Sequence, residues 1–168
     1  EFSSRLPGRR LLSDEDRAFL SAKFKAVAGR VHVRDFAAAF LWFTQIVATL
    51  SRVRAEWGIV QPAVLIRGFI GRPAASQLLK SSPPATFLIR FSESKPRALV
   101  IVLKQKNLKV LSVLATVRDD GTLAVMMNRK RREFADLGSL LFSIDVLQWL
   151  HPRVPCAEVV LALREATM

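Results

Sequence analysis

Large apolar residues near the start of the chain recur with the period of an α-helix. Ser13, followed by acidic residues at positions 14–16, is typical of a helix N-cap and first turn. A second helix is predicted to begin near Asp35, because apolar residues recur after it at steps of four and three. These residues are Phe36, Phe40, Phe43, Val47, Leu50 and Val53, with Trp42 and Ile46 widening the same face. Their helical spacing favours core packing over a ligand-binding cluster of rings.

The pattern changes after Trp57-Gly58, where prolines and glycines divide the chain into shorter segments. Pro73 is suited to the first turn of a helix that runs to about Lys80. Pro83-Pro84 must end that helix, because proline lacks a backbone donor and restricts the residue before it.

From Thr86 the residues are β-branched or apolar in short runs, which is typical of strands. The predicted strands cover 87–91, 99–103, 108–117 and 123–127, with a turn at 119–121, a polar, basic loop at 128–132 and a final helix over 137–147. The predicted fold class is therefore α+β, with a helical segment followed by a central antiparallel β-sheet flanked by two helices.

Composition narrows the classes of partner. The chain has 168 residues, of which 51% are hydrophobic, enough for one ordinary domain or two small ones that share a core. A net charge of +12 favours an anionic partner, such as nucleic acid, an acidic membrane or a phosphorylated protein. The longest apolar stretch, 36–50, is shorter than the roughly 20 residues of a membrane span, and we interpret it as a core helix. A single cysteine, Cys156, and two scattered histidines provide no metal-ligand cluster, and no cofactor is expected.

One strand contains a cation where an apolar residue is expected. In the stretch TFLIRFSES, from Thr86 to Ser94, alternation places Arg90 on a strand that is largely apolar on both faces. A strand of this kind is normally central and covered on both sides, so Arg90 should be partly desolvated. Glu93 projects to the opposite face if the strand stays extended, which would make it a poor partner. A buried guanidinium without a partner is costly.

A phosphate group would supply the missing partner, since guanidinium binds phosphate through a bidentate pair of hydrogen bonds. Ser92 and Ser94 offer hydroxyl groups, and the backbone N–H groups from Ser92 to Lys95 can form an anion-binding concavity. Arg72 adds a second cation if its helix packs on the Arg90 face. The alternative is that Arg90 pairs with a carboxylate elsewhere, such as Glu133 or Asp136.

At these residues the sequence resembles the Src homology 2 (SH2) domain of the STAT type, the signal transducers and activators of transcription. The resemblance rests on TFLIRFSES, on Gly68-Phe69-Ile70 and on Pro83-Pro84. Segments 12–14 and 40–43 are similar to the helical linker domain of that family, and segment 150–155 is similar to its leucine-tyrosine-proline segment.

The resemblance implies a phosphotyrosine-binding module without catalysis. Arg90 would clamp the phosphate, Arg72 would hold the basic position of the first helix, and Ser92, Glu93 and Ser94 would form the phosphate loop, with Glu93 contributing its backbone. Ser112 is the nearest match to the basic residue often found beneath the phosphotyrosine ring. The family tyrosine is replaced by His151, and the chain has no tyrosine, so dimerisation through a tail phosphotyrosine would need a residue absent from this chain.

The predicted organisation has three parts. Residues 1–11 form a disordered or artificial tail, 12–57 a helical STAT-like linker domain and 58–168 the SH2 domain. The chain is expected to be a piece of a longer protein, located in the cytoplasm and also in the nucleus.

Other function classes remain open at this point. The cluster Arg129-Lys130-Arg131-Arg132 is a basic patch that suits nucleic acid or a nuclear-import signal, or is simply a solvated loop. A protein-interaction domain that binds partners without phosphate is a further alternative. An enzyme is not expected, because the sequence has no Gly-rich phosphate loop with Lys-Ser or Lys-Thr, no nucleophile elbow and no His-Glu-x-x-His.

Overall fold

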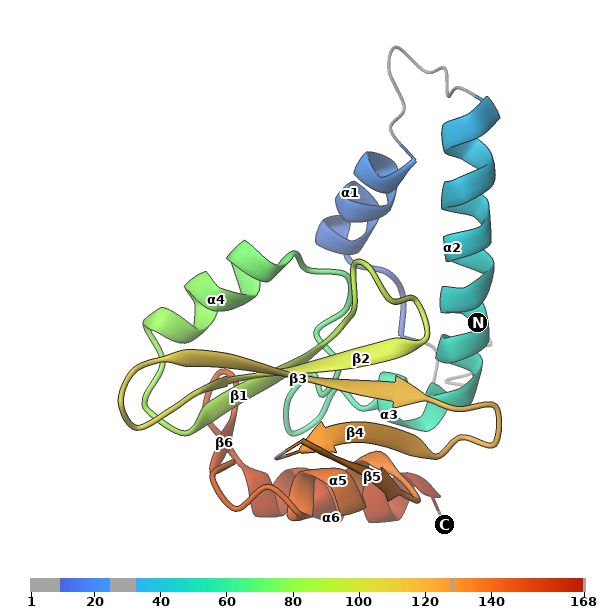
Figure 1. The fold of residues 1–168 in the computed structure, drawn as a ribbon. Coiled ribbons are helices and arrows are strands. Elements are labelled where there is room, and N and C mark those ends of the chain that lie inside the picture. Colours follow the sequence, from blue (N-terminus) through green and yellow to red (C-terminus); the bar gives the residue numbers. More distant parts are fainter. Residues whose placement is uncertain (1–9, 25–32, 128, 168) are drawn as a thin grey trace, which may run out of the picture.

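The computed structural model describes residues 10–24, 33–127 and 129–167, and Figure 1 shows their arrangement. Most of the predicted tail, 1–9, lies outside the described residues. The helices are α1 (Asp14–Lys23), α2 (Val33–Arg52), α3 (Arg54–Gly58), α4 (Arg72–Lys80), α5 (Leu137–Phe142) and α6 (Cys156–Thr167). The strands are β1 (Thr86–Phe91), β2 (Ala98–Lys104), β3 (Val110–Val117), β4 (Leu123–Met127), β5 (Lys130–Phe134), β6 (Trp149–Leu150) and β7 (Val154–Pro155). None of the described helices is both long and apolar enough to cross a membrane.

All the strands belong to one sheet, in the order β5-β4-β3-β2-β1-β6-β7. Strands β1 to β4 form the predicted antiparallel meander, whose tight turn contains Gly121 at φ +86°, and β5 continues it by one more antiparallel strand. The sheet as a whole is mixed, because β6 pairs with β1 in parallel. The predicted fold class is confirmed, and the parallel pair adds a strand on this side of the sheet that the sequence did not predict, where the chain returns after α5 in the same direction as β1.

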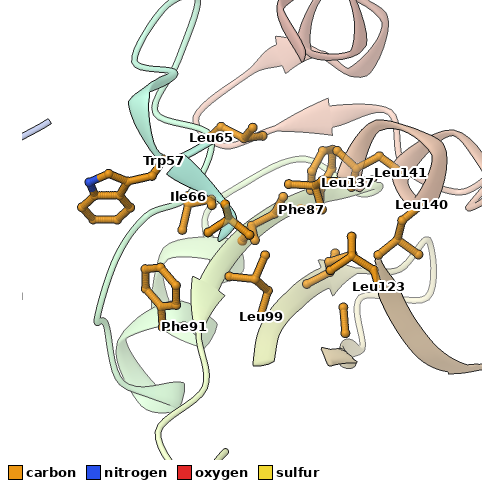
Figure 2. Close-up of a cluster of buried hydrophobic side chains, with 14 of the residues drawn as sticks. Trp57, Leu65, Ile66, Phe87, Phe91, Leu99, Leu123, Leu137, Leu140 and Leu141 are labelled. Carbon is orange, nitrogen blue, oxygen red and sulfur yellow. The ribbon is translucent and has the colours of Figure 1, made fainter. Parts of the chain in front are cut away.

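The central strand β1 is buried along its whole length, as predicted. Phe87, Ile89 and Phe91 face the main hydrophobic core, which also contains side chains from α2, α3, α5 and α6. Figure 2 shows Phe87 and Phe91 in this core with Trp57, Leu99 and Leu137. The opposite face of β1 packs with α4 in a smaller core formed by Ile70, Ala75, Leu79, Leu88, Val100 and Val102. In Figure 1, α4 lies across the sheet from α5 and α6.

The buried face of α2 differs from the predicted one. Trp42, Ile46 and Val53 are buried, whereas Phe36 and Phe40 are about half exposed. Phe36 and Phe40 stack on each other, and Phe36 and Phe43 contact Phe24 beside the end of α1. Periodicity identified the apolar side of the helix, but the sheet and α1 cover only part of that side.

Two predictions about the last third of the chain are wrong. The basic segment 130–132 is not a loop, because its backbone pairs with β4 as the edge strand β5. Charged side chains are well tolerated at a sheet edge, where they remain solvated and discourage further strand pairing. The predicted final helix ends at Phe142, and a further helix, α6, follows β7. The buried pair Val159 and Leu163 attaches α6 to the main core.

The carboxylate of Asp16 connects the helical segment to the sheet. It completes a capping box with Ser13, as the N-terminal sequence predicted, and its Oδ1 accepts a hydrogen bond from the Phe69 N–H at 2.7 Å. Gly68 has φ +106°, and a Cβ atom there would lie 2.1 Å from Asp16 Oδ1, so this close approach requires glycine. Asp16 thereby fixes the segment that leads into α4.

Replacing Asp16 with Ala should destabilise the chain by about 3 kcal/mol, because the buried Phe69 N–H would lose its acceptor and the Ser13 N–H and hydroxyl would lose the carboxylate half of the capping box. Chemical denaturation of the variant measures this loss. Asp14→Ala is the matched control, since Asp14 is exposed in the same helical turn and should leave stability almost unchanged. Equal midpoints for the two variants would contradict this role of Asp16.

Candidate functional site

Arg90 lies on the α4 face of the sheet and is 5% exposed. The strand register places Val100 of β2 opposite it, and Leu114 of β3 opposite Val100. Directly paired residues in antiparallel strands project to the same face, so the guanidinium lies beside an apolar floor. The cation is thus desolvated, as predicted.

Among the described residues, the acceptors of hydrogen bonds from the Arg90 guanidinium are all bound by the same nitrogen, Nη1. Nη1 donates to the carbonyl oxygen of Phe91 at 3.0 Å and to that of Ile70 at 3.4 Å. Nε is buried and has no partner among the described residues. Burial lowers the pKa of Arg90 and the nearby Arg72 charge lowers it further, while Glu93 acts in the opposite direction. The guanidinium therefore retains donor capacity for an anion.

The internal ion-pair partner of Arg90 is Glu93, with 3.6 Å between Arg90 Nη1 and Glu93 Oε1. The expectation that Glu93 points away is wrong, because β1 ends at Phe91 and strand alternation no longer applies two residues later. The alternative partners considered from the sequence are also wrong. Glu133, on β5, forms ion pairs with Arg118 and Arg131. Asp136 is the N-cap of α5 and accepts a hydrogen bond from the Ser139 N–H.

The helix that begins at Arg72 packs on the Arg90 face of the sheet, which is the condition under which Arg72 was expected to add a second cation. Segment 66–68 runs beside β1, where Arg67 N–H donates to Ile89 O and Phe91 N–H donates to Gly68 O. This pairing brings the start of α4 next to Arg90, with Gly71 as N-cap and Arg72 as the first helical residue. The Arg72 N–H donates to Glu93 Oε1 at 2.6 Å. The Arg72 charge also lies near enough to lower the pKa of Arg90, so a second cation and a helix N-terminus lie beside the strand cation.

The loop formed by residues 92–97 uses part of its own donor capacity. The Ser92 N–H donates to Ala98 O, and Ser92 Oγ accepts from the Lys95 N–H at 3.1 Å. Among the described residues, none accepts a hydrogen bond from the N–H of Glu93 or Ser94. The predicted concavity of four N–H groups is therefore wrong in extent, because two of those groups close the loop itself.

The helical segment holds the 92–97 loop at two carbonyl groups. Lys23 of α1 donates through Nζ to Glu93 O at 3.0 Å, and its ammonium group lies 5.0 Å from the centre of the Trp42 ring. Thr49 of α2 donates to Pro96 O at 3.0 Å. Sequence reasoning missed both contacts, because the partners are 70 and 47 positions apart.

The sheet face beyond Arg90 is hollowed into a groove of about 520 Å³. Lys95 lines it from the 92–97 loop, Ser112 and Leu114 from β3, and Arg131 from β5. Ser112 is exposed on this groove, two residues along β3 from Leu114, which the strand register puts in line with Arg90. Strand alternation puts Lys130 and Arg132 on the other side of β5 from Arg131, and Arg129 lies in the preceding turn. The residues of the basic cluster are therefore divided between the two faces of the edge strand and the turn before it.

Comparison with known proteins defines the class of domain that this geometry belongs to. Residues 65–141 match the model of the SH2 domain family. These residues include β1, α4 and the 92–97 loop, so the chain contains an SH2 domain, and SH2 domains are adaptor modules.

The resemblance to STAT proteins is confirmed as well. The chain is 32% identical over 88 residues to signal transducer and activator of transcription A of Dictyostelium discoideum. That match covers 52% of this chain and 12% of the relative, so the chain spans only a small part of that protein's length. Among solved structures, the SH2 domain of the CRK/CRKL homologue of Monosiga brevicollis aligns with a TM-score of 0.42 at 24% identity, covering 51% of this chain and 78% of that one.

Replacing Lys23 with Met should loosen the 92–97 loop while keeping the apolar stem on Trp42. Loss of one such hydrogen bond is worth about 1 kcal/mol, so the Ser92 and Lys95 amides should exchange with solvent about fivefold faster. Hydrogen exchange followed by NMR measures both amides. Arg17→Met, at an exposed position of α1, is the control, and unchanged exchange in the Lys23 variant would show that α1 does not hold the loop.

Proposed function

We propose that this chain is a phosphotyrosine-binding signalling module of STAT-like type. The observation that carries the proposal is the buried Arg90, whose Nε has no partner among the described residues and whose side chain lies beside Arg72. A phosphate on tyrosine brings a charge of about −1.5 to −2 at neutral pH and three acceptor oxygens. It therefore matches both the charge and the unused donors of the site.

The depth of the site favours phosphotyrosine over phosphoserine. Arg90 is at the level of the sheet, with Val100 and Leu114 beside it, and is almost completely covered. An aromatic ring is long enough to carry a phosphate down to this level and can bury its face on the apolar floor. The short side chain of phosphoserine offers no such ring, so its phosphate would reach the guanidinium only if the peptide backbone moved closer.

The mechanism is recognition without a chemical step. Arg90 and the N–H groups of Glu93 and Ser94 bind the phosphate oxygens, with Ser92, Ser94 and Arg72 as further donors. The ligand is a tyrosine-phosphorylated protein or peptide laid across the sheet, and the module would act in the cytoplasm and the nucleus. If the parent protein dimerises through a tail phosphotyrosine, that residue belongs to another part of its chain.

Nucleic-acid binding is less well supported. The basic residues of β5 are divided between two faces, and Arg131 is paired with Glu133. A duplex or single strand is held by many phosphates, so its affinity should fall steeply with salt and depend little on Arg90. The same salt titration with a phosphopeptide should show a shallow slope, since a single phosphate carries most of the interaction.

Replacing Arg90 with Ala should weaken binding of a degenerate phosphotyrosine peptide library about 100-fold, since several charge-assisted hydrogen bonds are lost. Fluorescence anisotropy gives the affinity, with dephosphorylated and phosphoserine libraries as specificity controls. Arg132→Ala removes the same charge from the exposed edge strand and should have little effect. Arg90→Lys keeps the charge but loses the guanidinium fork, so it should fall between the two.

Thermal unfolding of each variant separates loss of the site from loss of the fold. Binding that is equal in the wild-type and a folded Arg90→Ala protein would refute the proposed function.

A further inference from the structure

The carboxylate of Glu93 already occupies a position that suits a ligand oxygen. Its Oε1 lies 2.6 Å from the Arg72 N–H nitrogen and 3.6 Å from Arg90 Nη1. Both groups are donors that an incoming anion would use, the first at a helix N-terminus and the second on the strand cation. The described chain thus places an anion of its own between the two.

The surrounding backbone builds this contact. Lys23 holds the Glu93 carbonyl, and the hydrogen bond between Ser92 Oγ and the Lys95 N–H closes the loop around it. A Cβ atom on Gly71 would lie 3.3 Å from Glu93 Oε1, closer than most side-chain contacts. The glycine therefore leaves room for the carboxylate. The Glu93 side chain is 40% exposed, so it has a path into solvent when a ligand arrives.

We propose that Glu93 is an internal competitor that closes the phosphate position of the unliganded chain and so lowers its affinity for anionic ligands. This inference rests on the proposed function of the same site. A ligand must displace the carboxylate, and the apparent affinity falls by the fraction of molecules in which the position is open. The displaced carboxylate also remains tethered nearby and repels the ligand.

The competition lowers the apparent affinity for every anion by the same factor, so anions of low intrinsic affinity are the first to lose measurable binding. A monoanion, such as a sulfate ester or an acidic side chain, replaces one negative charge with another and gains little. A phosphate monoester brings nearly two charges and three acceptor oxygens, which use donors of Arg90 that the carboxylate leaves free. The same loss of affinity would therefore leave acidic or sulfated peptides with little binding, while a phosphate monoester still binds.

The test compares phenyl phosphate, a dianion at pH 7.5, with phenyl sulfate, a monoanion, so that no peptide sequence preference enters. Glu93→Gln should bind phenyl phosphate about fivefold tighter, the equivalent of about 1 kcal/mol. The gain for phenyl sulfate should be no larger, because the open fraction is the same for both ligands and the tethered carboxylate repels a monoanion less than a dianion. NMR titration of the 92–97 amides gives both affinities. The matched control is Glu158→Gln, which removes a carboxylate from the exposed side of α6, across the sheet from Arg90.

The Arg90→Ala background separates local competition from a general charge effect. If Glu93 competes at the Arg90 position, the gain from Glu93→Gln should largely disappear in the double variant. An equal gain in both backgrounds, or no gain in the single variant, overturns the inference while Arg90-dependent binding still upholds the proposed function. Phosphate binding that does not depend on Arg90 in the wild-type chain overturns both.

A measurement on the wild-type chain keeps the inference testable if the variant does not fold. The carboxyl carbon resonance of Glu93 should shift on saturation with phenyl phosphate, because its contacts with Arg72 and Arg90 are lost. A resonance that stays in place at saturation shows that the carboxylate is not displaced, and the inference fails.

Discussion

The desolvated guanidinium of Arg90 is the interaction around which the site is arranged. The strand that carries it is held by two hydrophobic cores, through Phe87 and Ile89 on one face and Leu88 on the other, so the cation cannot move to water. The cost of desolvating the guanidinium must therefore be offset by acceptor groups that lie beside it. The carbonyl groups of Ile70 and Phe91 and the carboxylate of Glu93 supply part of that compensation, and a phosphate would supply the rest.

The partners of Arg90 are placed by contacts that begin far away in the chain. Asp16 of α1 anchors the segment that ends at Arg72, and Lys23 and Thr49 anchor the 92–97 loop. At the other end of α4, Lys104 of β2 donates to the carbonyl groups of Lys80 and Ser82, and this fixes the helix against the sheet. The helical segment and the SH2 domain are thus joined at the site itself. A shift of α1 or α2 is therefore expected to move the 92–97 loop and the start of α4.

Local sequence patterns predicted an element correctly where its tertiary surroundings did not change its ends or its buried face. Alternation gave the correct face for Arg90 because β1 stays extended from Thr86 to Phe91. It gave the wrong side for Glu93 because the strand had already ended. The charged run at 130–132 suggested a loop, yet alternate residues of β5 face opposite sides of the sheet and the edge keeps both sets solvated. At α2, Trp42 and Ile46 are buried in place of Phe36 and Phe40, because periodicity does not reveal which part of an apolar face is covered.

The sequence by itself determined the helical start, the antiparallel meander and the presence of a buried strand cation flanked by Arg72 and the loop serines. These features depend on short-range periodicity, capping and turn residues, which act within a few positions. Only the tertiary structure decided that Glu93 pairs with Arg90, that α1 and α2 hold the loop, and that β6 joins β1 in parallel. These contacts depend on where a strand ends and on how elements distant in sequence pack together, and short-range patterns specify neither.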